Sequence, residues 1–510
     1  MQQATIDYPQ RTEIGTGQAG LAESARPAIS RLARLLASQT VFVLVVLAAQ
    51  MMVVLDTTIV NVALPHIRSA LGFSAAGLSW VLNAYVLTFG GLMLLGARSG
   101  DLQGRRRTFL FGIALFSLGS LLGGLAGSSD ALLAARAFQG IGAAFAAPSA
   151  LGLLTAAFPD GKERLRAIAL FTAVSAAGGA VGLLAGGLIT EWLSWRWVMF
   201  VNVPIGIAVF ALGGRVIAET PRRHGHFDFL GALTSTAGMA GIVLGLVEAG
   251  NVGWGKPVTF GSLAAGIALL TLFVYGERRA VEPILPLRLF ANVTRTSANV
   301  SRGLVYAGMY GVFFFLSQFL QDVRGYSPLM SGLAFLPVPV TVFISSQLAS
   351  RLLTRGVRPK ALMLVGTLID VVSLVLASQL GAGASTLRVL GNLVIFGIGM
   401  GLSLVSMTSA SLAGVEPADA GAASGLVNVV QQLGAALGLA VLVTVYSDAT
   451  RGSATSRLAS AGAQVMMHGL HDAFFAGAIF AVAAIALVAV GVRMQPARQQ
   501  LPAPTAQMAD

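Results

Sequence analysis

Residues 40–65 read TVFVLVVLAAQMMVVLDTTIVNVALP, an apolar run in which Asp56 is the only charged residue. A helix needs roughly 20 mostly apolar residues to cross a bilayer, and this run exceeds that length. The run is also too long for the hydrophobic part of a signal peptide, and no small-residue cleavage site follows it. The stretch therefore predicts a transmembrane helix that carries one carboxyl group.

Apolar runs of similar length recur along the rest of the chain. Hydrophobic residues make up 55% of the sequence and charged residues 11%, whereas about 25% of an average soluble domain is charged. A soluble core could not hide this much apolar surface, so we expect an all-α polytopic membrane protein. Fourteen transmembrane helices are predicted, near residues 40–65, 78–97, 108–127, 131–157, 165–190, 196–218, 228–248, 257–276, 299–321, 327–353, 359–380, 387–411, 421–447 and 471–493.

The positions of Lys and Arg test this count. With the N-terminal tail in the cytoplasm, the tail and the inside connectors hold 25 of the 33 basic residues and the outside connectors hold seven, which leaves Arg136 alone within a predicted helix. This asymmetry is what the positive-inside rule requires. We therefore expect a multi-pass protein of the cell membrane with both termini in the cytoplasm. The net charge of +12 follows from topology and does not indicate nucleic-acid binding.

Several chemistries are excluded or not indicated by composition. The chain has no cysteine, so disulfides, thiolate metal sites and cysteine nucleophiles are impossible. Its five histidines are interpreted as surface or interface residues and not as metal ligands. No catalytic pair stands out. We expect a monomer that is not an enzyme and binds no cofactor.

A weak internal repeat indicates two halves. The connectors at residues 97–107 and 347–356 are both short and basic, and they occupy equivalent places if an insert separates two six-helix units. Repeated halves with a site between them are a common transporter plan. The expected organisation is a disordered tail (1–38), a six-helix bundle (39–220), two inserted helices with a cytoplasmic linker (221–298), a second six-helix bundle (299–495) and a disordered tail (496–510).

Charged residues within the apolar runs are candidate functional groups, because each costs about 2.5–3.5 kcal/mol at the bilayer centre. Asp56 is the clearest case, and we interpret it as a protonation switch, since removal from water favours the uncharged carboxyl. The alternative is a packing hydrogen bond to a neighbouring Thr or Asn. Arg136 is interpreted as its electrostatic partner, with a static salt bridge or an interfacial position as the alternatives. Asp370 is a secondary acidic candidate or a structural hydrogen-bonding group, and Glu248 and Asp322 are expected at the interface.

The run 299–321 is rich in aromatic residues and also carries an amide. Tyr306, Tyr310, Phe314 and Gln318 suit a cavity that binds amphipathic or cationic molecules by stacking and cation–π attraction. The alternative is an aromatic face that contacts lipid.

Taken in order, five groups of motifs resemble the major facilitator superfamily, specifically its fourteen-helix drug:proton antiporter branch. The similarity spans about 40–495 and includes a run at 84–96 that is similar to mycobacterial efflux pumps. The motifs are LDTTIVNVALP (55–65), GDLQGRRR (100–107), RAFQGIG (136–142), WRW (195–197) with NVPIG (202–206), and GLVN (425–428) with QLG (432–434).

The resemblance implies a major facilitator fold, a gating loop on the cytoplasmic side and a midplane cavity lined by helices 1, 4, 9 and 12. In helix 5 the branch usually has a Gly-Pro pair, which this chain replaces with glycines alone. The residues that the resemblance assigns are Asp101, Gly104, Arg105 and Arg106 in the gating loop, Asn428 in the cavity, and Gly182, Gly186 and Gly187 in the helix 5 motif.

The leading hypothesis is proton-coupled efflux of hydrophobic or cationic drugs by alternating access, in which protonation of Asp56 and substrate binding exclude each other. The partners would be small molecules, lipids among them, together with protons and the bilayer. An alternative is an exporter or flippase of a specific endogenous lipid or metabolite without strict proton coupling. A membrane enzyme or sensor is a third hypothesis, which no motif supports.

Overall fold

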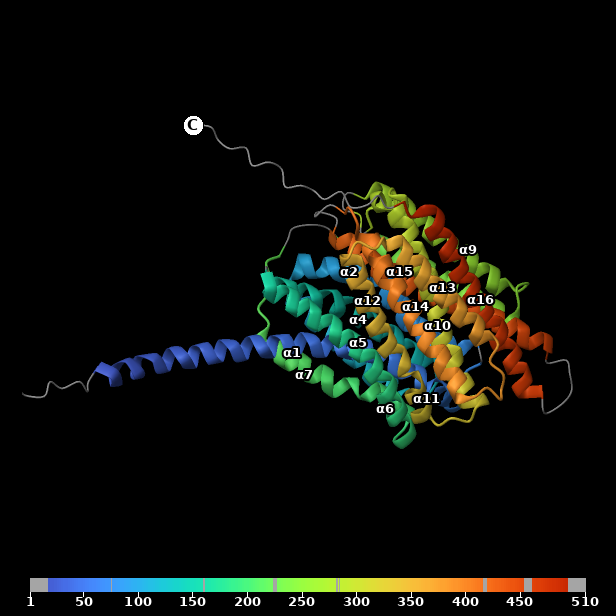
Figure 1. Ribbon diagram of the computed structural model, residues 1–510, viewed down its shortest axis with the longest axis horizontal. Helices are drawn as coiled ribbons and strands as arrows, with labels where there is room; N and C mark the ends of the chain where they lie inside the picture. Colours follow the sequence, from blue (N-terminus) through green and yellow to red (C-terminus); the bar gives the residue numbers. More distant parts are fainter. Residues whose placement is uncertain are drawn as a thin grey trace, which may run out of the picture.

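The computed structural model describes residues 17–493, apart from 75, 159–160, 223–226, 281–282, 284, 416–419 and 454–460. These residues form helices and no strand, and the helices lie side by side in one elongated body (Figure 1). Fourteen helical segments in the described chain are long and apolar enough to cross a membrane. The all-α polytopic fold and the predicted number of helices are therefore confirmed.

The first half of the chain supplies six of these segments. Its helices are α1 (Gly17–Leu71), the 3-10 turn η1 (Gly77–Ser79), α2 (Trp80–Gln103), α3 (Arg105–Leu125), α4 (Ser129–Ala157), α5 (Gly161–Trp192), α6 (Trp195–Phe200) and α7 (Asn202–Val216).

The remaining eight segments follow in order. They are built from α8 (Phe229–Val252), α9 (Pro257–Arg279), the 3-10 turn η2 (Leu287–Phe290), α10 (Val293–Gln318), the π-helical turn η3 (Phe319–Val323), α11 (Pro328–Phe335), α12 (Pro337–Thr354), α13 (Pro359–Ser378), α14 (Thr386–Leu412), α15 (Ala420–Ser453) and α16 (Ala461–Gly491).

Proline and glycine set many of the helix boundaries. Pro257, Pro328 and Pro359 each stand at the start of a helix, where the missing N–H costs no hydrogen bond. Gly104 separates α2 from α3 with a φ of 104°, a backbone conformation that residues with a Cβ rarely adopt. These local signals explain why the connectors are short and the helices stop where they do.

Packing divides the helices into two groups. In the first bundle, α1 packs on α5 and α7, and α4 packs on α2 and α3; in the second bundle, α10 packs on α15 and α16, and α14 packs on α12 and α13. Helices α8 and α9 pack mainly on each other, and α8 also contacts α2 and α15. The main direct contacts between the bundles are those of α2 with α15, α5 with α11 and α12, and α1 with α10.

Glycine allows some of these helices to approach closely. Where α3 crosses α4, a Cβ built on Gly112 would lie 2.7 Å from the carbonyl oxygen of Gly142. Lipid provides no hydrophobic force between helices, so such close backbone contact supplies the packing energy.

Helix α1 begins earlier than the sequence led us to expect. It starts at Gly17, inside the segment 1–38 that we predicted to be a disordered tail, and its first turns project away from the bundles (Figure 1). The segment contains many Ala, Arg and Leu residues, which favour a helix, and this composition outweighs its polar character. Residues 1–16 and the predicted tail after residue 493 lie outside the described residues.

The connectors lie at two ends of the body, the basic face and the opposite face. The basic face carries the connector between α2 and α3, with Arg105, Arg106 and Arg107. The opposite face carries the connector between α1 and η1 and the one between α5 and α6.

Candidate functional site

Asp56 lies at the centre of a buried polar cluster in the first bundle. Its side chain has no exposed surface, and Arg136 Nη1 donates a hydrogen bond to Oδ2 at 2.5 Å. Gln139 Nε2 and Asn202 Nδ2 both donate to Oδ1, at 3.0 and 2.9 Å. The structure thus brings the two predicted charges together and adds two amide donors from α4 and α7.

Arg136 connects three helices. Its Nε donates to the carbonyl oxygen of Val81 on α2 at 3.0 Å, and its Nη1 also donates to Gln139 Oε1 at 2.8 Å. The guanidinium stands over the ring of Tyr85, 4.5 Å from its centroid, and Gln139 reaches on to Ser120 of α3. Because the side chain is buried, Arg136 does not reach the membrane interface, which was one alternative for it.

The polar neighbours of Asp56 on its own helix are occupied elsewhere. The hydroxyl groups of Thr57 and Thr58 donate to carbonyl oxygens one turn back in α1, and Asn61 Nδ2 donates to the carbonyl of Thr57 at 2.9 Å. The hydrogen-bond partners of Asp56 therefore come from other helices. A buried ion pair with two additional donors is a costly arrangement to assemble, and removing either charge would leave the other uncompensated.

Helix α10 of the second bundle turns two tyrosines toward this cluster. Tyr310 is partly buried and packs against the hydrophobic core that contains Tyr85. Tyr306 lies one turn earlier, and its ring is 5.2 Å from the guanidinium carbon of Arg302. These two predicted cavity residues thus lie on the side of α10 that faces the first bundle.

The other predicted cavity residues lie in different surroundings. Phe314 is buried and packs edge-on against Phe315, with ring centroids 5.1 Å apart. Gln318 accepts a hydrogen bond from Arg68 Nη1 at 3.4 Å, so it takes part in a contact between the bundles. Asn428 is exposed on α15, where its Nδ2 donates to the carbonyl of Ser424 at 3.0 Å.

Ionic and hydrogen-bonded contacts tie the two bundles together near the opposite face. Arg68 Nη2 of α1 forms an ion pair with Asp322 Oδ2 of η3 at 3.0 Å. Further along the same two helices, Ser317 Oγ donates to the carbonyl oxygen of Asn61 at 2.9 Å. Asp322, which we expected only at the membrane interface, is therefore part of a link between the bundles.

A second contact at the same face joins α5 to α11. The backbone N–H of Leu329 donates to Glu191 Oε2 at 2.9 Å. A Cβ built on Gly187 would lie 2.7 Å from the carbonyl oxygen of Pro328, so a larger residue would push the helices apart. Gly187 of the helix 5 motif is thus located where the bundles meet.

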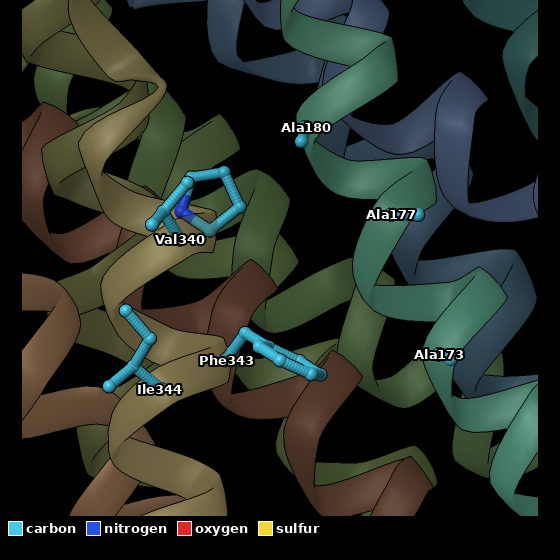
Figure 2. A pocket seen from close by; sticks show the side chains of 7 residues that line it. Ala173, Ala177, Ala180, Val340, Phe343 and Ile344 are labelled. Carbon is cyan, nitrogen blue, oxygen red and sulfur yellow. The ribbon is translucent and has the colours of Figure 1, made fainter.

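The same two segments separate toward the middle of the body. There α5 and α12 enclose an apolar cavity of 520 Å³ that is open at its side. Figure 2 shows Ala173, Ala177 and Ala180 on α5 and Val340, Phe343 and Ile344 on α12, with the ring of Phe343 extending toward α5. The lining consists of Ala173, Ala177, Ala180, Pro339, Val340, Phe343 and Ile344.

The remaining glycines of the helix 5 motif pack against α1. A Cβ on Gly182 would lie 2.9 Å from the carbonyl oxygen of Leu55, and one on Gly186 would lie 2.6 Å from that of Ile59. Helix α5 consequently lies directly against the backbone of α1 beside Asp56. In this chain the glycines of the motif serve close packing without the proline.

The predicted gating loop forms a compact ionic network on the basic face. Asp101 Oδ1 and Arg105 Nη2 are 3.0 Å apart, and Arg105 Nη1 donates to the carbonyl of Gly152 on α4 at 2.7 Å. Arg106 Nη2 donates to the carbonyl of Gly214 at the end of α7. Within the described part of the chain, these partners all belong to the first bundle.

Glu219, which the sequence analysis did not single out, completes this loop. Its carboxylate accepts the backbone N–H groups of Arg106 at 3.0 Å and Arg107 at 3.3 Å, which are among the first N–H groups of α3 and have no partner within the helix. A Cβ on Gly104 would lie 2.5 Å from Glu219 Cδ, so the glycine makes room for this cap. Glu219 lies outside the recognised motif, and its position after α7 gives no local signal.

Asp370 lies in a separate place, between α13 and α14 of the second bundle. It is buried, and Ser403 Oγ donates to its Oδ2 at 3.1 Å. Its Oδ1 has no hydrogen-bond partner among the described residues. A secondary acidic role for Asp370 stays a prediction.

Arg302 requires a correction to the charge count. From the sequence we placed Arg302 with the inside connectors and expected Arg136 to be the one basic residue within a helix. In the structure Arg302 is inside α10 and only 7% exposed. Its place near the start of an apolar run made it resemble a flanking charge, whereas helices on both sides cover it.

The described residues include fourteen helical segments long and apolar enough to cross a membrane, with a buried ion pair in the first bundle, and this defines a polytopic membrane protein. Residues 46–439 match the family model of the Major Facilitator Superfamily, and the chain belongs to that family. It is therefore a transporter and not an enzyme.

Curated relatives include several named for drug resistance or export. The chain is 40% identical to the puromycin resistance protein pur8 of Streptomyces alboniger over 464 residues, which cover 89% of this chain and 92% of the relative. It is 41% identical to the cephamycin export protein CmcT of Amycolatopsis lactamdurans, covering 87% and 90%. The multidrug resistance protein Stp of Mycobacterium tuberculosis is 35% identical, with 78% and 74% covered.

Solved structures agree in fold. A bacterial homolog of the human lysosomal transporter Spinster, in an inward-facing and occupied conformation, superposes with a TM-score of 0.66 over 90% of this chain and 99% of its own, at 20% identity. The nucleoside transporter NupG gives 0.64 over 89% and 100%, at 10% identity. At such identities the likeness concerns the fold alone.

Proposed function

We propose that this protein is a proton-coupled exporter of hydrophobic or cationic drugs and other toxic small molecules. The buried Asp56–Arg136 ion pair in the first bundle is the observation that carries the proposal. The names of the curated relatives, which refer to resistance, export and multidrug resistance, support the direction of transport.

The proposed orientation places the basic face and both termini in the cytoplasm. The excess of Lys and Arg in the connectors of that face supports this assignment. The opposite face then lies on the outer side of the cell membrane. There the contacts Arg68–Asp322 and Glu191–Leu329 hold the two bundles together and close the transporter on that side. In this state the transporter takes up substrate from the cytoplasm or from the inner leaflet.

The two bundles are proposed to rock against each other about the space between them, with α8 and α9 as a peripheral insert. The network of Asp101, Arg105 and Arg106 holds the basic end of the first bundle together while it moves. Tyr306, Tyr310 and the apolar side chains of the α5–α12 cavity supply surfaces that suit amphipathic molecules.

Coupling follows from what a proton does to the ion pair. When a proton from the outer side binds an Oδ atom of Asp56, the carboxyl becomes neutral and Arg136 loses its counter-charge. Breaking a buried pair in this way costs about 3–5 kcal/mol, which favours a rearrangement of α1, α2 and α4. Tyr310, which packs against the hydrophobic core that contains Tyr85, places the second bundle next to this change. The membrane potential adds about 2.3 kcal/mol per charge per 100 mV.

Asp56→Asn tests this role in inverted membrane vesicles that carry out pH-driven uptake of ethidium. The variant keeps the size of the side chain and removes the titrating oxygen, so we expect proton-driven uptake to be lost. Asp130→Asn, on the exposed first turn of α4, is the matched control and should transport normally. Full uptake by Asp56→Asn would refute the switch.

A second candidate function is export of an endogenous lipid or metabolite without strict coupling. The apolar α5–α12 cavity and the helix 5 motif without proline favour it. Reconstituted protein distinguishes the two functions: a drug-induced pH change indicates antiport, and movement of a labelled lipid without a pH gradient indicates the alternative.

A further inference from the structure

Arg302 is a buried cation that has no carboxylate partner among the residues the structure describes. Its Nη1 donates to Thr408 Oγ1 at 2.6 Å and to the carbonyl of Leu404 at 3.2 Å, and its Nη2 donates to Gln431 Oε1 at 2.9 Å. All three acceptors are neutral. Its Nε has no hydrogen-bond partner among the described residues, although it is buried.

A charge in this position calls for a compensating anion. Buried charges in proteins are normally paired, because removal from water is otherwise costly. No ion pair joins Arg302 to an acidic residue in the described part of the chain, and Asp370, the buried acid of the same bundle, bonds to Ser403. None of the described residues therefore supplies the negative charge that would neutralise Arg302.

Helix α15, which supplies Gln431, lies where the two bundles meet. On α15, Gln432 packs against Gly90 of α2, in the first bundle, while the adjacent Gln431 bonds to Arg302. One and two turns nearer the basic face, Asn428 and Ser424 are exposed, whereas Gln431 is partly buried. A row of polar side chains thus leads from an accessible surface of α15 to the guanidinium.

The geometry also suits a particular ligand group. An arginine fork presents parallel N–H groups that match the two oxygens of a carboxylate or phosphate. Here Tyr306 covers one side of the guanidinium, with its ring centroid 5.2 Å away, and the Thr408 and Gln431 bonds fix its orientation. The Nε–H has no acceptor among the described residues, and Nη2 carries a second N–H beside the one that bonds to Gln431.

We propose that Arg302, oriented by Thr408, Gln431 and Tyr306, binds the carboxylate or phosphate group of a transported molecule. The proposal rests on the transport function and extends its substrates to amphipathic anions. The anionic group belongs either to a membrane lipid headgroup or to a free solute, and the chemistry at Arg302 is the same for both.

The test uses the full-length protein in phosphatidylcholine nanodiscs. One arm measures fluorescence binding of 11-(dansylamino)undecanoic acid and of its neutral amide. The other arm uses native mass spectrometry to compare retention of phosphatidylglycerol and phosphatidylcholine. We expect the acid to bind at least about tenfold more tightly than the amide if the ligand is a free solute, or phosphatidylglycerol to be retained selectively if it is a lipid.

Two variants show whether such binding depends on Arg302. Arg302→Gln removes the charge, and Gln431→Glu places a carboxylate 2.9 Å from Nη2, where it would neutralise the guanidinium and exclude an external anion. Both should abolish the preference for the anion, and Gln431→Glu should also raise the thermal stability. Arg388→Gln, an exposed arginine of α14, is the control that removes the same charge from the same bundle.

The outcomes separate this proposal from the transport mechanism. Selective binding that Gln431→Glu removes supports the site, and the arm in which it occurs identifies the source of the anion. Equal binding of acid and amide with equal retention of both lipids overturns it, as does selectivity that survives in well-folded Gln431→Glu. Because binding is measured without a pH gradient, failure of proton coupling in Asp56→Asn would not affect the result.

Discussion

The two bundles each bury an arginine, but they compensate its charge differently. In the first bundle Arg136 meets Asp56 at 2.5 Å and the cluster is closed from solvent. In the second bundle Arg302 meets a hydroxyl, an amide and a backbone carbonyl, all of them neutral. The first arrangement can change its charge by taking up a proton, whereas the second can be neutralised only by an anion. Two sites of related composition are thus suited to different ligands.

The largest effect is expected from removing one member of the first pair. Arg136→Gln leaves Asp56 buried without its cation, and we expect a loss of stability of about 3–5 kcal/mol together with loss of transport. The double variant Asp56→Asn with Arg136→Gln should recover much of the stability but no proton-driven transport. Thermal unfolding in detergent, followed by gel filtration, measures the first quantity and vesicle uptake the second.

The comparison fails if Arg302→Gln costs as much stability as Arg136→Gln. We expect Arg302→Gln to lower the stability less, because it leaves no buried carboxylate without a partner among the described residues. A similar cost would mean that the second bundle also neutralises its arginine internally.

An intermediate effect is expected where the bundles meet at the opposite face. Asp322→Asn removes the ion pair with Arg68, whose side chains are 24% and 32% exposed, so the pair contributes at most about 1 kcal/mol. Opening of this face should become roughly two- to fivefold more frequent.

The absence of native cysteine makes this opening measurable. Ser331→Cys places a single thiol in the buried part of α11, which packs on α5, and an impermeant maleimide would label it faster in the Asp322→Asn background. Asp472→Asn, whose partners lie on its own helix, is the control. Unchanged labelling would show that Arg68–Asp322 does not restrain the opposite face.

The smallest effect is expected at Asp370. The hydrogen bond that Asp370 accepts from Ser403 can be kept by an amide oxygen, so Asp370→Asn should change stability by less than about 1 kcal/mol and leave transport near normal. Uptake in vesicles at several pH values measures this. A loss like that of Asp56→Asn would make Asp370 a second proton site.

The fold and part of the site could be predicted from sequence because their signals are local. Helix length and hydropathy give the fourteen segments, and Asp56 and Arg136 stand out as single charges within apolar runs. What brings Asn202 and Tyr310 to them is packing between helices distant in sequence, which no periodicity encodes. Arg302 was missed because a charge near the end of an apolar run has the same local pattern whether it is flanking or buried.

Glycine packing along α5 has a mechanical consequence. Gly182 and Gly186 hold this helix against the backbone of α1 at the turns next to Asp56, and Gly187 abuts α11 of the second bundle. Gly182 and Gly187 are five residues apart, or roughly 7.5 Å along a helix with a rise of about 1.5 Å per residue, and Gly186 lies between them. A helix is stiff over so short a distance. Because α5 is also packed against the backbone of α1, the two helices would move together as a rigid unit. A movement of α1 at Asp56 would then be transmitted through α5 to the junction of the bundles.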